Sequence, residues 1–289
     1  MLKIYLLTFV LSFWKIAYSQ VEWNYSIQPK IVQNSFSWDI AGNSAGENPN
    51  VLSELSWKDI MQIGITTQVG IKFKNKFSVD FAYNFSKTVK GTVSDIDYSE
   101  DNKNAITENQ KYNSDKGNSK SYNLNFGYII HKHWGELDIC ANAIYEKNTY
   151  FLLASEKHLH SSYQPKFIGG GLGITAKVNL NSDFELNVSN IYSLNKYTAT
   201  ADWNLRTDFS HPKSFEHTAT TCRIYGQYGI SYKWKKQIHI APFIAYTKYV
   251  NIGNGLDKLY YNNGDISYTR LNNVKSISKE IGIKFIYIL

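Results

Sequence analysis

Apolar and polar residues alternate one by one along several long segments of the chain, and this period constrains the fold more than any other feature. The clearest runs cover residues 77–85, 122–128, 184–189 and 281–289. A period of two places successive side chains on opposite faces of a β-strand, whereas a helix repeats about every 3.6 residues. The sequence therefore predicts an all-β protein whose strands have one apolar and one polar face.

The connections between these strands are of two kinds that alternate along the chain. Residues 74–76, 131–134, 180–183 and 234–236 form very short connections, whereas the others are long and polar, the longest running from about residue 92 to 120. Tight turns at one end and long loops at the other are typical of a bacterial membrane barrel. We therefore predict a ten-stranded antiparallel transmembrane β-barrel with strands at 22–38, 51–73, 77–92, 119–131, 135–153, 164–180, 184–200, 214–234, 237–252 and 266–289.

The composition agrees with a barrel in a membrane. Aromatic residues make up 15% of the chain, with 22 Tyr, 15 Phe and 7 Trp. A membrane barrel places such side chains on its lipid-facing surface and keeps its lumen polar. Several predicted strands exceed the roughly 9–11 residues that cross a bilayer, so we expect the barrel to project outside the membrane.

The N-terminal segment has the features of a secretory signal peptide. Lys3 supplies a positive charge, residues 4–14 form an apolar run, and residues 17–19 offer small side chains at a cleavage site. We expect residues 1–19 to be removed and residues 20–289 to form one barrel domain. An even strand count puts both termini on one side, so we predict a bacterial outer membrane location with periplasmic termini and extracellular loops.

The net charge of +7 at pH 7 narrows the choice of partners. Export argues against nucleic acid, and a basic surface fits acidic lipid headgroups or a peptide. The expected partners are outer-membrane lipid, including lipopolysaccharide, the barrel-assembly machinery during biogenesis, and a peptide or host protein at the outer loops. The histidine pairs at 131/133 and 158/160 have no further ligands at suitable spacing, so we expect no metal site and no cofactor.

Several segments together resemble a known family. Residues 53–58, 163–167, 173–175, 183–186 and 282–285 follow, in order and spacing, the strands of the omptins, which are outer-membrane endopeptidases. They are also similar to the related Protochlamydia outer membrane protein family, and residues 48–52 favour these relatives. The resemblance covers about residues 51–289 and implies an omptin-like barrel.

The resemblance also implies a catalytic site at the outer rim. Omptins hold a water molecule between an Asp-x-Asp pair and an Asp-x-His dyad, and the histidine acts as the base. The matching residues here are Asp95 and Asp97 on one side and Asp202 on the other. Asn204 stands in place of the histidine, and an amide cannot serve as a general base. His211 in the same loop is a candidate replacement.

The other omptin features match less closely. Asp39 is the candidate for an acidic side chain that would bind the substrate. On the outer surface, Tyr145 and Lys166 are candidates for contact with lipid, although Lys147 and Thr149 replace the acidic and arginine residues of the omptin lipid A motif.

Three functions stay open. The first is an omptin-type aspartyl endopeptidase on the cell surface, which the three matching acids at the rim favour. The second is a non-catalytic barrel that acts as an adhesin or envelope protein, which Asn204 favours. The third is a narrow channel, which is disfavoured because inward side chains largely fill small barrels.

Overall fold

The computed structural model of the protein describes residues 21–289, and the predicted signal peptide lies outside the described residues. Two single 3₁₀ turns, Asp101–Lys103 and Ser155–Lys157, interrupt an otherwise all-β chain. No helix among the described residues is long and apolar enough to cross a membrane. The strands are β1 (Val21–Ile40), β2 (Ser53–Phe73), β3 (Phe77–Glu100), β4 (Asn104–Asn113), β5 (Gly117–Lys132), β6 (Gly135–Ala154), β7 (Leu159–Asn179), β8 (Phe184–Asp202), β9 (Phe215–Lys235), β10 (Ile238–Asn251), β11 (Gly255–Tyr260) and β12 (Ile266–Ile288).

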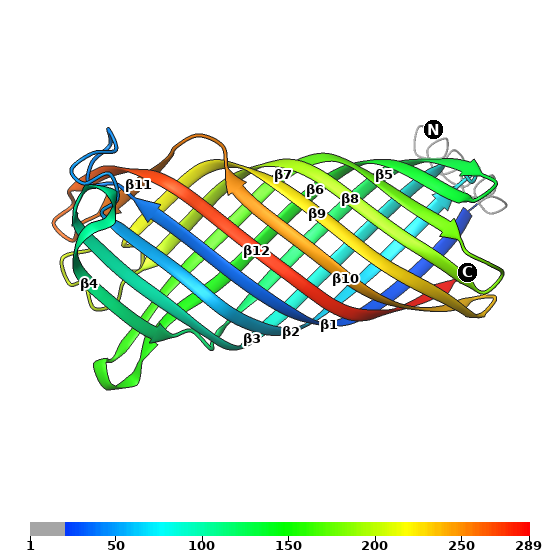
Figure 1. Cartoon of the computed structure of the whole chain (residues 1–289), viewed down its shortest axis with the longest axis horizontal. Coiled ribbons are helices and arrows are strands. Elements are labelled where there is room, and N and C mark those ends of the chain that lie inside the picture. Colours follow the sequence, from blue (N-terminus) through cyan, green and yellow to red (C-terminus); the bar gives the residue numbers. More distant parts are fainter. Residues whose placement is uncertain (1–20) are drawn as a thin grey trace, which may run out of the picture.

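The strands close into an antiparallel barrel (Figure 1). The first strand β1 pairs with both β2 and the last strand β12, so the sheet has no free edge in the ring. β4 and β5 share the place between β3 and β6, and β10 and β11 share the place between β9 and β12. The ring therefore has ten strand positions, and the predicted fold class is confirmed.

The two ends of the barrel differ. The tight turns lie within residues 73–77, 132–135, 179–184 and 235–238. They lie at the end of the barrel where β1 begins and β12 ends, which we call the short-turn end (Figure 1). The opposite end, the long-loop end, carries β4, β11 and the longer connections (Figure 1). The predicted turn positions are therefore confirmed.

Two of the predicted long loops contain strands. β3 continues to Glu100 and folds back as β4, so the region predicted as a loop from residue 92 to 120 is mostly a hairpin. β11 likewise lies between residues 252 and 266, where we expected a loop. Six of the ten residues of β4 are exposed and polar. This hairpin has no apolar outer face, so its sequence lacks the alternation that identified the other strands.

The outer wall next to the short-turn end is apolar. Its strands present exposed large side chains that alternate with lumen-facing polar ones. A continuous apolar surface of this kind matches the hydrocarbon core of a bilayer. Representative outward residues are Ile27, Ile63, Phe81, Phe126, Leu172, Ile230 and Ile283.

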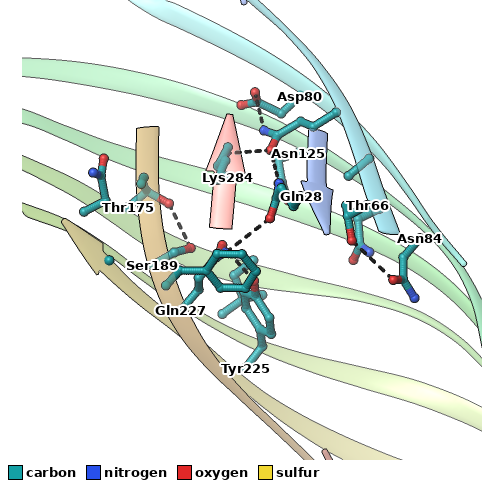
Figure 2. A pocket seen from close by; sticks show the side chains of 18 of the residues that line it. Gln28, Thr66, Asp80, Asn84, Asn125, Thr175, Ser189, Tyr225, Gln227 and Lys284 are labelled. Carbon is teal, nitrogen blue, oxygen red and sulfur yellow. Dashed lines mark hydrogen bonds between the residues drawn. The ribbon is translucent and has the colours of Figure 1, made fainter. Parts of the chain in front are cut away.

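Inside this apolar belt the lumen is a polar chamber of about 520 Å³ (Figure 2). Its walls carry amides, hydroxyls and charged groups that bond across the lumen. Lys30 Nζ lies 2.6 Å from Glu280 Oε2, and Lys72 Nζ lies 2.8 Å from Glu136 Oε2. Pairing of this kind offsets the cost of removing charges from bulk water.

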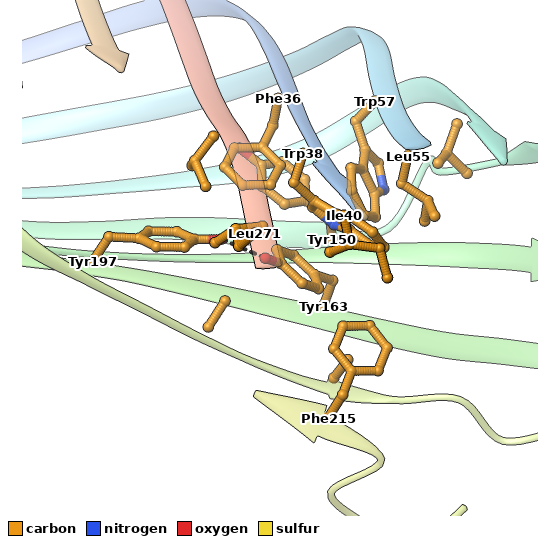
Figure 3. Close-up of a cluster of buried hydrophobic side chains, with 14 of the residues drawn as sticks. Phe36, Trp38, Ile40, Leu55, Trp57, Tyr150, Tyr163, Tyr197, Phe215 and Leu271 are labelled. Atoms are coloured by element: carbon orange, nitrogen blue, oxygen red, sulfur yellow. Dashed lines mark hydrogen bonds between the residues drawn. The ribbon is translucent and has the colours of Figure 1, made fainter. Parts of the chain in front are cut away.

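An aromatic layer closes the lumen above the chamber, toward the long-loop end (Figure 3). Phe36 of β1 meets Tyr150 of β6 and Tyr163 of β7 with ring centroids 5.4 and 5.6 Å apart, so the layer joins opposite walls. This packing disfavours a channel through the barrel. The layer consists of Phe36, Trp57, Tyr150, Tyr163, Phe167, Tyr197 and Tyr249, each at most 1% exposed.

Candidate functional site

The predicted Asp-x-Asp pair lies on the lumen-facing side of the long-loop end. Asp95 pairs with Leu55 and Asp97 with Ser53 of β2, and both continue the alternation of Val93, which is fully buried in the core. Glu108 of β4 pairs directly with Asp97 and therefore lies on the same face. We call Asp95, Asp97 and Glu108 the acidic wall.

The acidic wall changes the protonation of Asp95. Burial, and after it the charges of Asp97 and Glu108, raises the pKa of the Asp95 carboxyl to about 7. A carboxyl with a pKa near neutral can accept or donate a proton under physiological conditions. The same environment favours a positive side chain that would neutralise the wall.

Asp202 contacts His211, the candidate replacement for the missing histidine. It is the last residue of β8, and its Oδ1 lies 2.6 Å from Nδ1 of His211 in the β8–β9 loop. The two residues are partly exposed and form an Asp–His pair. A carboxylate in this position orients an imidazole ring.

The Asp–His pair and the acidic wall belong to opposite faces of the barrel wall. Ala199 and Ala201, which precede Asp202, are core residues at 2% exposure, so the alternation directs Asp202 to the outer side. Asp202 also pairs across β7 with Ser162, while the neighbouring Ser161 and Tyr163 are buried. The structure thus brings Asp202 to His211 without bringing this pair to Asp95.

Asn204, which stands where the resemblance calls for a histidine, holds two loops together. Its Oδ1 accepts hydrogen bonds from the backbone N–H of His160 and from Ser161 Oγ, at 2.8 and 3.1 Å. Its Nδ2 donates to the carbonyl of His158 at 2.9 Å. The amide therefore supplies both an acceptor and a donor to the β6–β7 hairpin.

Arg206 of the β8–β9 loop lies near the acidic wall. It forms a bidentate pair with Asp208, with N···O distances of 2.9 and 2.8 Å. The hydrogen bond to Asp208 is the main cause that raises the pKa of Arg206, and the charge of Asp97 makes a smaller contribution in the same direction. The sequence offered no sign of this arginine–aspartate pair.

Asp39 is 6% exposed, and its carboxylate is hydrogen-bonded to two neutral asparagine side chains. Its two carboxylate oxygens accept hydrogen bonds from Asn272 Nδ2 at 3.0 Å and Asn273 Nδ2 at 2.8 Å. Its neighbours Trp38 and Ile40 belong to the lumen core, so Asp39 faces the other way. Its predicted role in substrate binding stays a prediction, and the contacts describe a link between β1 and β12.

The outer surface above the apolar belt carries a row of lysines that includes a predicted lipid contact. Lys120, Lys147 and Lys166 are direct cross-strand neighbours on β5, β6 and β7. Tyr145 is two residues before Lys147 on the same face, and its ring lies 5.9 Å from that of Tyr122. Between residues 21 and 289 none of these three ammonium groups is in an ion pair. We call Lys120, Lys147 and Lys166 the lysine row.

A buried polar network below the rim was not predicted. Tyr163 Oη lies 2.8 Å from His217 Nδ1 and also bonds to Tyr197 Oη. His217 Nε2 lies 3.2 Å from Asp257 Oδ1, although without the alignment of a hydrogen bond, and Thr269 Oγ1 donates to Asp257 Oδ2 at 2.9 Å. The shared parity of His217 and the apolar Phe215 gave no sign that this histidine faces the lumen.

Within the part of the chain that the structure describes, no set of three or more His, Cys, Asp and Glu side chains is arranged to hold an ion. The expected absence of a metal site stays a prediction.

Comparisons with solved structures agree with this architecture. Outer membrane protease OmpT from Escherichia coli matches with a TM-score of 0.70 and 14% identity, over 94% of this chain and 97% of that chain. OprG from Pseudomonas aeruginosa matches with a TM-score of 0.40 and 11% identity, over 91% and 95% of the two chains. The translocator domain of the autotransporter NalP from Neisseria meningitidis gives 0.41 and 12%, over 91% and 88%. At these identities the likeness to OmpT is one of fold, and no curated protein matches the chain.

The closed ring, the apolar belt and the likeness to OmpT define an outer-membrane β-barrel of omptin-like fold. More narrowly, the chain belongs to the Protochlamydia outer membrane protein family, whose model matches residues 32–141 and 140–289. The family resemblance inferred from the sequence is confirmed, and with it a bacterial outer membrane location.

Proposed function

We propose that this barrel is a cell-surface binding protein that holds a basic peptide segment of a partner against its acidic wall, without cleaving it. In this proposal the long-loop end faces outward and the termini lie in the periplasm. The observation that carries the proposal is the shared face of Asp95, Asp97 and Glu108 at the mouth.

The electrostatics of the wall support a cationic ligand. Three neighbouring carboxyl groups repel one another, and the raised pKa of Asp95 reflects burial together with that repulsion. A lysine or arginine side chain placed between them would relieve the repulsion and gain charge-assisted hydrogen bonds. Arg206 supports this reasoning, because the chain's own guanidinium already lies near Asp97.

The other side of the rim supports binding over hydrolysis. Water activation of the omptin type needs a base and the two aspartates around one water molecule. Here the Asp202–His211 pair belongs to the outer side of the wall, and the amide of Asn204 is fully used between two loops. Asp202 and Asn204, which stand at omptin positions, thus make contacts within the rim.

The test is to mix the refolded barrel with fluorescein-labelled peptides, one rich in lysine and arginine and one acidic peptide of equal length. We expect saturable binding of the basic peptide, weakened about tenfold in the double variant Asp95→Asn/Asp97→Asn, since a charged hydrogen bond contributes about 1.5–3 kcal/mol. Asp59→Asn is the matched control, because Asp59 is an exposed aspartate of β2 outside the wall. Equal binding of both peptides would contradict the proposal.

The second candidate is the endopeptidase, which two observations favour. Asp95 has a pKa suited to proton transfer, and Asp202 holds His211 as an Asp–His pair. The same samples test it by mass spectrometry of the peptides after long incubation with lipopolysaccharide. Cleavage that is lost in both Asp95→Asn and His211→Gln would establish the protease and replace the binding proposal, whereas intact peptides support it.

We also propose that the lysine row contacts lipid phosphates, as Tyr145 and Lys166 led us to expect. Three unpaired ammonium groups on adjacent strands repel one another unless anions lie between them. Lipopolysaccharide phosphates at the upper edge of the apolar belt would supply these anions.

The lipid contact is tested by native mass spectrometry of the barrel with lipopolysaccharide. Changing Lys120, Lys147 and Lys166 to Gln should reduce the bound lipid several-fold, because each phosphate contact is charge-assisted. Changing Lys132, Lys235 and Lys236 at the short-turn end to Gln is the control with equal loss of charge. An equal loss of lipid in both triple variants would show that total charge, and not the row, attracts the lipid.

A further inference from the structure

The polar chamber below the aromatic layer is a second candidate binding site, separate from the rim. Its volume of about 520 Å³ lies within the roughly 300–1,000 Å³ usual for small-molecule sites. Its lining extends down to residues beside the short turns, including Lys177, Glu185 and Lys233. The aromatic layer closes its upper side, so a solute would reach it from the short-turn end (Figure 3).

Arg223 lies at the top of this chamber. It is 4% exposed and lines the cavity directly beneath the aromatic layer, where its cross-strand neighbour on β10 is Tyr249 of that layer. The guanidinium carbon lies 4.8 Å from the centre of the Tyr225 ring and 5.9 Å from that of Tyr249. The two rings fix the guanidinium in place.

The guanidinium of Arg223 contacts Tyr249 but is only partly satisfied by the described residues. Its Nε and Nη1 are buried and have no hydrogen-bond partner between residues 21 and 289. A buried cation without a counter-charge is costly, and buried charges in proteins are therefore normally paired. The two free N–H groups point to a partner that is not part of this chain.

Several other charged groups of the chamber have partners within it. Lys30 pairs with Glu280, and Lys284 Nζ donates to Gln68 Oε1 at 2.9 Å (Figure 2). Glu146 accepts a hydrogen bond from Tyr249 Oη and another from Asn148 Nδ2, each at 2.9 Å. Each oxygen of this carboxylate therefore already accepts a hydrogen bond.

We propose that the chamber binds a small solute that carries a carboxylate or phosphate group, and that Arg223 holds this oxyanion. Neighbouring N–H groups of a guanidinium form a planar fork that matches two oxygens of such a group. The amide and hydroxyl groups of the walls would accept hydrogen bonds from the rest of a polar molecule. The proposal does not depend on what the rim binds.

The chain allows a direct test, because it contains only three arginines, Arg206, Arg223 and Arg270. Their Nε–Hε groups give three signals in a nitrogen-15 NMR spectrum of the folded barrel, and single Arg→Lys variants assign them. The barrel is titrated with sodium phosphate and with sodium acetate, against sodium chloride at the same ionic strength. We expect a saturable shift of the Arg223 signal with at least one oxyanion, while the Arg206 and Arg270 signals follow the chloride control.

A calorimetric titration of phosphate or acetate, whichever shifts the signal, supplies the second readout. Arg223→Gln should weaken binding of that anion at least about tenfold, while Asp59→Asn, at an exposed aspartate outside both sites, should leave it unchanged. The proposal is overturned if the Arg223 signal of the unmodified barrel moves no further than in chloride, or if all three arginine signals shift alike. Because that titration uses the unmodified chain, a variant that fails to fold does not remove the test.

Discussion

Among individual residues, Asp95 carries the clearest prediction, because burial and neighbouring acids raise its pKa to about 7. An unfolded chain releases this proton near pH 3.9. The folded state therefore binds the proton more tightly, and the wild-type barrel loses stability as pH rises from about 4 to about 7. Replacing Asp95 by Asn removes this loss, so Asp95→Asn should be more stable than wild type at pH 8 by about 2 kcal/mol, with a smaller gain at pH 4.

Urea unfolding in detergent at the two pH values measures this difference. Asp97→Asn is the companion variant, because it removes a like charge beside Asp95 and should recover part of the same gain at pH 8. If Asp95→Asn raises the free energy of unfolding equally at pH 4 and pH 8, the surroundings do not disfavour the charged form of the Asp95 carboxyl.

Asn204 leads to a prediction about the rim. Three hydrogen bonds tie it to the β6–β7 hairpin, so Asn204→Ala should loosen the β8–β9 loop at a cost of about 1 kcal/mol. Trypsin cleavage after Arg206 should then be several times faster. Asn263→Ala is the control, because Asn263 bonds only within its own loop, to Asp265. Unchanged cleavage in Asn204→Ala would mean that the loop is held by other contacts.

The sequence predicted one side of the rim better than the other. Alternation within a regular strand was enough to put Asp95 and Asp97 on one face. The Asp202–His211 contact depends on how an irregular loop of a dozen residues folds back, and periodicity carries no information about that. Glu108 and Arg206 were missed because they come from the hairpin and the loop that lack the alternating pattern.

Among the strands, β7, β8 and β9 are joined by hydroxyl and imidazole groups inside the lumen. Tyr163 of β7 bonds to Tyr197 of β8 and His217 of β9. Removing its hydroxyl leaves both partners buried and unsatisfied, so Tyr163→Phe should destabilise the barrel by about 1–3 kcal/mol. Tyr145→Phe on the lipid-facing side is the control, and thermal unfolding followed by gel mobility is the measurement. Equal stability of the two variants would contradict a structural role for this network.

The barrel as a whole was largely predictable. Every predicted strand is present and every predicted tight turn is in place, because a membrane barrel needs an apolar outer face wherever it touches lipid. The pattern fades above the belt, and there the sequence did not reveal that β3 extends to Glu100 or that β4 and β11 exist. The aromatic layer was also not predicted, because aromatic residues that face the lumen show the same local alternation as aromatic residues that face lipid.

The closed lumen leads to a prediction for the whole molecule. We expect no ion conductance when the wild-type barrel is inserted in a planar bilayer, because the aromatic layer spans the lumen. Phe167 and Tyr249 stack at 4.1 Å within this layer, so the double variant Phe167→Ala/Tyr249→Ala should show current steps. The control is the double variant Phe126→Ala/Phe81→Ala on the outer belt, which also removes two aromatic side chains. Steps in the wild-type barrel would contradict a sealed lumen.

The aromatic layer also has a consequence for the cell that carries the protein. Every open pore in an outer membrane is a route for antibiotics and bile salts, so the number of open barrels that a cell tolerates is limited. A barrel whose lumen is blocked adds no such route. Many copies of this protein are therefore expected to leave the permeability of the membrane to these solutes unchanged.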